Sequence, residues 1–169
     1  MINILNLLIF KISWAAIIFY SLNFNLIIPT ILISLILVFY KTINYYSFRD
    51  IIKLLIIALI LFLLDYLNLL FNFVNFDQNH LSFFGFPFFM YIFWVNFILI
   101  VPKSLSFLDS KYLYQYVLGF LSGSSVYFIV LKLGLLEISS YINLIFIGLN
   151  WGFIIVINYY LIRLFKVSK

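Results

Sequence analysis

Long apolar segments separated by short polar ones dominate this chain of 169 residues. A helix needs about 20 mostly apolar residues to cross the roughly 30 Å hydrocarbon core of a bilayer. The second and fourth segments are short for a full crossing, and they need help from flanking aromatic residues or a locally thinner bilayer. We predict transmembrane helices over residues 4–22, 26–40, 51–71, 87–101, 112–133 and 141–164.

These segments predict helices because backbone polar groups at membrane depth must find partners within the protein, and the short alternating strands of a barrel are missing. Only Asn23, Phe24 and Asn25 separate the first two segments, and Pro29 follows, so an antiparallel hairpin is expected there. Lys11 interrupts the first segment, which is therefore not expected to be a signal peptide. The sequence predicts an all-α, polytopic membrane helix bundle in a single domain spanning residues 1–169.

Composition supports the membrane class. Apolar residues make up 67% of the chain and charged residues 9%, against about 45–50% and about 25% in soluble domains. So few charges cannot cover a soluble surface, and the expected partner is the lipid bilayer. The basic residues are scattered in loops, so no nucleic-acid partner is expected. The chain has no cysteine, which excludes disulfides and thiolate metal sites.

The distribution of basic residues predicts the orientation. Cytoplasmic loops of membrane proteins carry an excess of Lys and Arg, and an N-in/C-in arrangement places eight of the ten basic residues inside. These are Lys41, Arg49, Lys53, Lys103, Lys111, Arg163, Lys166 and Lys169. Lys132 falls outside, and we expect it to form an exposed pair with Glu137 worth no more than about 1 kcal/mol.

One acidic residue lies deep in a predicted helix. Asp65 is roughly 21 Å from the cytoplasmic end of the third helix, where a charge costs at least about 2.5 kcal/mol, so it should face the bundle and be protonated or hydrogen-bonded. Asn96 and Asn150 lie at roughly 16 Å and Tyr127 at roughly 22 Å by the same count. We predict that Asp65, Asn96, Tyr127 and Asn150 form a polar midplane layer. Ligand binding, proton coupling, plain packing and a misplaced helix are alternative interpretations of Asp65.

Asn68 continues the Asp65 face one turn later and is a secondary candidate. Lys11 lies too close to the inner end of its helix to pair with Asp65, and its side chain is expected to extend toward the cytoplasm. Gly119-x-x-x-Gly123, followed by Ser124, allows the fifth helix to approach a neighbour closely.

Motifs along nearly the whole chain resemble those of an uncharacterised family. They are Asn6-x-x-x-Phe10-x-x-x-Trp14, Leu64-Asp65, Gly85-x-Pro87, Trp94, Ser104-Leu105-x-Phe107-Leu108, Gly119-x-x-x-Gly123, Tyr127, Leu133-Gly134-x-x-Glu137 and Trp151. In this order and spacing they resemble the proteobacterial inner-membrane family named domain of unknown function 2878 (DUF2878). On this resemblance Asn6, Trp14 and Trp94 join Asn68 and Ser124 as secondary candidates.

The resemblance implies a small multi-pass protein of the bacterial inner membrane, often encoded beside fatty-acyl-modifying enzymes of the cyclopropane-synthase kind, and it implies no activity. Family members carry Gln in the first helix and Gly-Pro in the fifth, where this chain has Lys11 and Ser124. Residues near Pro102 and Lys103 differ as well. No family-wide role is therefore carried over to those positions.

Two classes of function fit the sequence. One is an accessory or small transport protein with a polar midplane site. A membrane protein or a lipid-modifying enzyme is the possible partner, and it would bind to the helix faces of this protein. The alternative is a membrane-embedded enzyme acting on lipid acyl chains, although such enzymes usually carry histidine clusters or paired acids. His80 is the single histidine and is expected in an outer loop, away from Ser124. We therefore expect no catalytic residue, no metal and no cofactor.

Overall fold

The structure is a computed structural model that describes residues 4–20, 24–43, 45–76, 82–83 and 85–167. Of these residues, 79% are helical. The long helices are α1 Ile4–Tyr20, α2 Phe24–Thr42, α3 Phe48–Leu70, α4 Phe88–Ser104, α5 Tyr112–Lys132 and α6 Asn143–Leu164. A 3-10 turn, Ser106–Leu108, joins α4 to α5. The all-α class is therefore confirmed.

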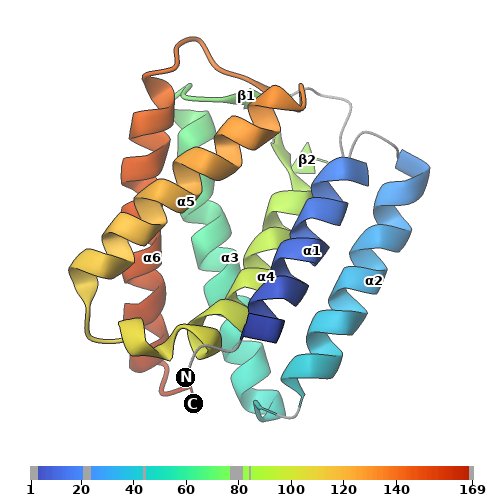
Figure 1. Cartoon of the computed structure of the whole chain (residues 1–169), viewed down its shortest axis with the longest axis vertical. Coiled ribbons are helices and arrows are strands. Elements are labelled where there is room, and N and C mark those ends of the chain that lie inside the picture. The colour runs from blue at the N-terminus through green and yellow to red at the C-terminus, as the bar shows by residue number, and fades with distance from the viewer. Residues whose placement is uncertain (1–3, 21–23, 44, 77–81, 84, 168–169) are drawn as a thin grey trace.

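Successive helices run in alternating directions, so α1 begins and α6 ends at the same end of the bundle, here called the terminal end (Figure 1). Helix α4 is the central element, with most of its side chains buried. It packs against α1 and α2 on one side and against α3 on the other, whereas α5 packs mainly on α6. The tilted helix α5 therefore crosses in front of the bundle without packing along α1.

Short strands close the end of the bundle away from the termini. Strand β1, Asn75–Phe76, pairs antiparallel with β4, Leu136–Glu137, and so ties the segment after α3 to the segment after α5. Strand β2, Ser82–Phe83, pairs with β3, Phe86–Pro87, just before α4. Gly134 ends α5 with φ +72, a left-handed backbone that favours glycine.

The predicted helices agree with the described ones to within a few residues, and two differences need correction. Helix α2 begins at Phe24, so Phe24 and Asn25 are helical rather than part of a turn, while Asn23 lies outside the described residues. Helix α4 continues through Pro102 to Ser104, where the Ser104 hydroxyl donates to the Ile100 carbonyl at 2.9 Å. The backbone polar groups beyond the predicted helix ends find their hydrogen-bond partners within the same helix, so both helices exceed their predicted lengths.

Two glycines let α5 lie directly on α6. A Cβ atom on Gly119 would lie 2.6 Å from the carbonyl oxygen of Trp151, and one on Gly123 would overlap the Trp151 side chain. The Ser124 hydroxyl adds a hydrogen bond to the Leu144 carbonyl of α6, at 3.0 Å. The close approach expected from Gly119-x-x-x-Gly123 is therefore confirmed, and Trp151 is the side chain it accommodates.

The prediction of an ion pair between Lys132 and Glu137 is wrong, because these two described residues form no ion pair. The Lys132 ammonium lies 5.4 Å from the centroid of the Phe128 ring, one turn back on α5. The ion pair found within the described part of the chain joins Lys53 to Asp50 at 3.1 Å. Lys132 and Glu137 are both exposed, so solvent satisfies them separately and nothing fixes them in one geometry.

Candidate functional site

The carboxylate of Asp65 forms a closed polar centre inside the bundle. Its Oδ1 accepts hydrogen bonds from Asn68 Nδ2 at 2.9 Å, the Tyr127 hydroxyl at 2.9 Å and Trp151 Nε1 at 2.7 Å. Its Oδ2 accepts one from Trp94 Nε1 at 3.1 Å. Asp65 has 0% of its surface exposed. We call these five residues the Asp65 centre.

Four helices supply the Asp65 centre: Asp65 and Asn68 come from α3, Trp94 from α4, Tyr127 from α5 and Trp151 from α6. All four partners donate, which matches an ionised carboxylate, since that group only accepts hydrogen bonds. Such charge-assisted bonds are about twice as strong as neutral ones. The centre therefore ties together four helices around one acceptor group.

Asn150 of α6 contacts Asn68 of this centre but does not contact Asp65 itself. Its Nδ2 donates to Asn68 Oδ1 at 3.1 Å and to the Leu64 carbonyl at 3.2 Å. Because the Asn68 oxygen accepts from Asn150, the Asn68 amide group is oriented with its nitrogen toward Asp65. Asn150 thus acts on Asp65 through Asn68.

Aromatic rings enclose the carboxylate. The rings of Trp94 and Trp151 lie 4.9 Å apart between centroids, and Tyr127 meets Trp151 edge-on at 6.0 Å. These three residues are each at most 1% exposed. The surrounding medium is therefore apolar, which strengthens the four hydrogen bonds and makes each of them costly to lose.

Asn96, predicted in the same midplane layer as Asp65, does not contact the Asp65 centre. Its Nδ2 donates to the Ser34 hydroxyl of α2 at 2.7 Å. Asn96 follows Trp94 by two residues, which is about 200° around a helix, so it faces α2 while Trp94 faces Asp65. Depth along a helix was predictable, but depth does not decide which face a residue occupies.

The remaining predicted residues lie elsewhere. Asn6 is buried on α1, and Ser124 joins α5 to α6 as described above. Trp14 is half-buried on α1, and its Nε1 is buried without a hydrogen-bond partner. Trp151 was not predicted as a site residue, although its place in the family motifs and the need of a buried indole N–H for an acceptor were available signals.

A groove of about 530 Å³ lies beside the Asp65 centre, between α1, α4 and α5. We call it the lateral groove, because it lies where α5 crosses the bundle without packing along α1 (Figure 1). Its floor contains Phe93, Phe97 and Trp151. Its walls are formed by Phe10, Lys11, Trp14 and Ala15 of α1 and by Leu121, Ser122, Ser125, Val126 and Ile129 of α5.

Trp151 connects the groove to the polar centre. One part of its side chain borders the groove, while its Nε1 donates to Asp65. The hydrogen bond holds the indole in place, and Gly123 leaves the space that the ring occupies. The Asp65 centre thereby fixes the shape of the groove floor.

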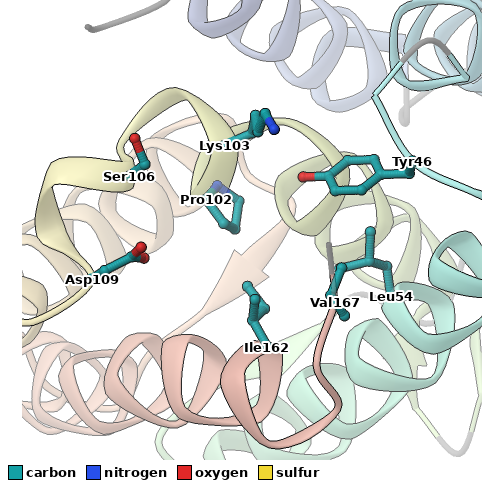
Figure 2. A pocket seen from close by; sticks show the side chains of 8 residues that line it. All are labelled: Tyr46, Leu54, Pro102, Lys103, Ser106, Asp109, Ile162 and Val167. Carbon is teal, nitrogen blue, oxygen red and sulfur yellow. The ribbon is translucent and has the colours of Figure 1, made fainter. Parts of the chain in front are cut away.

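A smaller cavity of about 120 Å³ lies at the terminal end. Figure 2 shows the Tyr46 phenol and the Asp109 carboxylate pointing into it from opposite sides. Burial, followed by the nearby negative charge of Asp50, raises the pKa of Tyr46 to about 12, so its phenol is neutral at physiological pH. This volume admits a few water molecules or a small ion, since one water takes up about 30 Å³.

Among the described residues, no group of three or more aspartate, glutamate or other ligating side chains is placed to hold a metal ion. His80 lies outside the described residues. Two helices, α5 and α6, are long and apolar enough to cross a membrane by length and composition. The fold and the Asp65 centre define an all-α protein with membrane-compatible helices around a closed polar centre.

The comparison with protein families agrees with the motifs. The model of the family described as "Protein of unknown function (DUF2878)" matches residues 3–157, and the chain belongs to this family. Searches of curated proteins and of solved structures find no match.

Proposed function

We propose that this protein is a multi-pass, non-catalytic accessory protein of the bacterial inner membrane that holds an acyl chain of a membrane lipid in the lateral groove. The groove carries this proposal, because it is open along the side of the bundle and is lined mostly by apolar side chains. Its volume of about 530 Å³ lies within the roughly 300–1,000 Å³ of typical ligand pockets.

The Asp65 centre supports a structural role rather than transport. Both carboxylate oxygens accept from side chains of the protein itself, and the residue has no exposed surface. A substrate or proton carrier would have to displace donors that the centre has already arranged. We therefore assign Asp65 the task of fixing Trp151, and through it the groove floor.

The membrane placement has separate support. Large apolar side chains are exposed along the outer helices, among them Ile12, Ile36 and Leu113 with exposed fractions of 68%, 66% and 72%. Patches of this kind are rare on soluble proteins and typical of lipid-facing surfaces. We propose six crossings with both termini inside, and the alternating helix directions and the inside excess of basic residues support this topology.

A reporter fused to the C-terminus tests this topology. We expect a fluorescent protein that matures only in the cytoplasm to be bright, and alkaline phosphatase at the same position to be inactive. Fusions after residue 80 should behave in the opposite way. Active phosphatase at the C-terminus would overturn the N-in/C-in arrangement.

Photo-cross-linking in membranes tests the groove. Cells fed a photoreactive fatty acid should yield cross-linked peptides from the groove walls on α1 and α5. Ala15→Phe and Ser125→Phe each place a ring in the groove and should remove most of this labelling, because both positions line the groove and are exposed.

The matched control is Ile12→Phe, which adds a ring at a position on α1 that lies outside the groove lining. We expect its labelling to equal that of the wild type. Labelling spread evenly over all exposed helix faces, unchanged by either blocking variant, would show that the chain merely contacts bulk lipid.

The accessory role predicts that a lipid-modifying enzyme contacts the helices beside the groove. In a strain lacking this protein, the acyl composition of membrane lipids should change, while the purified protein alone should leave lipids unaltered. The alternative, a membrane-embedded enzyme acting on acyl chains, predicts that the purified protein converts lipids by itself. An unchanged acyl composition in the deletion strain would contradict both versions.

A further inference from the structure

The cavity at the terminal end is lined by two opposite charges that do not pair with each other. Lys103, near the end of α4, and Asp109, just after the 3-10 turn, both line it. The ion pair found among the described residues joins Lys53 to Asp50 instead. Figure 2 shows Lys103 on the same side of the cavity as Tyr46, and Asp109 on the opposite side. The cavity therefore has a positive side and a negative side.

Contacts within the chain hold the Lys103 ammonium on the positive side. It lies 5.9 Å from the centroid of the ring of Tyr45, the residue that precedes Tyr46. A cation over an aromatic face is attracted by the ring, so this contact favours the observed position over one beside Asp109. An ionised carboxylate has about four lone-pair sites. Asp109 can therefore accept from a ligand in the cavity in addition to partners within the chain.

Tyr46 supplies a neutral hydrogen-bond donor on the positive side. Its side chain is 8% exposed, and the phenol points into the cavity, where a ligand can reach the hydroxyl (Figure 2). The hydroxyl forms no hydrogen bond within the described part of the chain. The nearby Asp50 carboxylate accepts from Lys53 at 3.1 Å and from the Ser47 hydroxyl at 2.8 Å, so its charge is already balanced. The positive side thus offers an ammonium and a phenol to an acidic group.

Apolar side chains form the remaining walls. Leu54, Ile162 and Val167 line the cavity and are at most 7% exposed. Surroundings of this kind strengthen charge interactions relative to bulk water. The cavity of about 120 Å³ has the volume of about four water molecules at roughly 30 Å³ each. It therefore has room for one compact polar group and not for an acyl chain.

We propose that this cavity binds a small zwitterion that carries an acidic group and a primary ammonium a few bonds apart. The acidic group accepts from the Lys103 ammonium and the Tyr46 hydroxyl, and the ligand ammonium donates to the Asp109 carboxylate. A simple anion would be repelled by Asp109 and a simple cation by Lys103, so only a molecule with both charges matches both sides. The site is separate from the lateral groove, since no residue lines both.

Two sources carry this chemistry. Free amino acids and amino phosphates are small zwitterions in the cytoplasm. The ethanolamine headgroup of a membrane phospholipid carries the same pair of charges, and in the proposed topology the terminal end lies at the cytoplasmic surface. Phosphoethanolamine represents both sources, because it has the phosphate and the ammonium of each amino phosphate and of the headgroup.

Calorimetric titration of the full-length protein in mild detergent tests the proposal. The probes are phosphoethanolamine and its two halves, inorganic phosphate and ethanolamine. We expect a dissociation constant of about 1 mM for phosphoethanolamine, weak enough for the ligand to dissociate during extraction. Each half should bind about three- to fivefold more weakly, the range for losing one partly exposed ion pair.

Substitutions on the two sides should change the probes in opposite directions. Asp109→Asn should weaken phosphoethanolamine about three- to fivefold and strengthen phosphate, because it removes an attraction for the ammonium and a repulsion for the anion. Lys103→Gln should weaken both phosphate-containing probes and strengthen ethanolamine. Tyr46→Phe keeps the ring and should weaken only the phosphate-containing probes. A purely structural role for these residues predicts instead that all three probes weaken together.

The matched control is Lys111→Gln, which removes an exposed cation near the same end but outside the cavity lining. We expect it to bind all three probes as the wild type does. Wild-type protein that binds none of the probes, or binds phosphoethanolamine no more tightly than phosphate, would overturn the proposal and leave a cavity that holds only water.

Nanodiscs distinguish the two sources. The titration with phosphoethanolamine is repeated in nanodiscs of phosphatidylethanolamine and of phosphatidylglycerol with identical acyl chains. Binding suppressed only in phosphatidylethanolamine would identify a lipid headgroup as the ligand, and equal binding in both would identify a soluble zwitterion. Absence of binding in both would overturn the site.

Discussion

Replacing Asp65 with leucine is expected to lower the free energy of unfolding by about 3–5 kcal/mol, the cost of removing one partner from a buried charged network. Leucine fits the space but accepts no hydrogen bond. The indole groups of Trp94 and Trp151, the Tyr127 hydroxyl and the Asn68 amide would then be buried without their acceptor. In cells, the amount of folded protein in the membrane should fall several-fold.

Asp65→Asn should have a smaller effect, about 1–3 kcal/mol. Its amide keeps one acceptor oxygen, but its NH₂ group must face a donor from the protein, because all four partners donate. Membrane abundance and the thermal unfolding midpoint of the purified protein measure both effects. Glu137→Gln, at an exposed site, is the control and should change neither quantity. Wild-type abundance and midpoint in Asp65→Leu would refute a structural role for the carboxylate.

Trp151→Ala is the second substitution with a large expected effect, also about 3–5 kcal/mol, the usual range for truncating a buried aromatic ring. It removes the shortest hydrogen bond to Asp65, at 2.7 Å, and the ring that fills the space beside Gly123. It also removes part of the groove floor. Groove-specific photo-cross-linking should therefore be lost along with stability.

Trp151→Phe separates the two roles of this residue. The phenyl ring retains most of the packing, while Asp65 loses one of its four donors, so a loss of about 1–2 kcal/mol is expected. Cross-linking in the groove should largely persist. The matched control is Phe153→Ala on the same helix, a ring with 61% of its surface exposed, which should leave thermal unfolding within about 0.5 kcal/mol of the wild type. Equal losses for Trp151→Ala and Phe153→Ala would contradict the account of Trp151.

Helix positions were largely predictable because the length and apolarity of each segment are visible in the sequence. The burial of Asp65 was also predictable, since no other environment at that depth offsets the cost of a carboxylate. What could not be predicted was the rotation of each helix about its axis. Asn96 and Trp94 lie almost at one depth on α4, yet the first contacts α2 and the second contacts Asp65.

The lateral groove could not be predicted from the sequence for a different reason. The groove depends on the tilt of α5, and the hydrophobic pattern of an apolar segment carries no information about the tilt of the helix that it forms. The role of Trp151 could not be predicted because an indole counts as apolar in a hydrophobic pattern. Its N–H indicates a hydrogen-bond role only once the ring is known to be buried beside an acceptor. Ser34, the partner of Asn96, carries no signal beyond being a small polar residue in an apolar helix.

The central claim is that the lateral groove holds a membrane lipid, and its most direct test is native mass spectrometry of the full chain extracted from its own membrane without added lipid. The account predicts one phospholipid adduct per chain in the wild type and in Ile12→Phe, and the bare chain in Ala15→Phe and Ser125→Phe. Bare wild-type protein, or equal adducts in all four proteins, would contradict it.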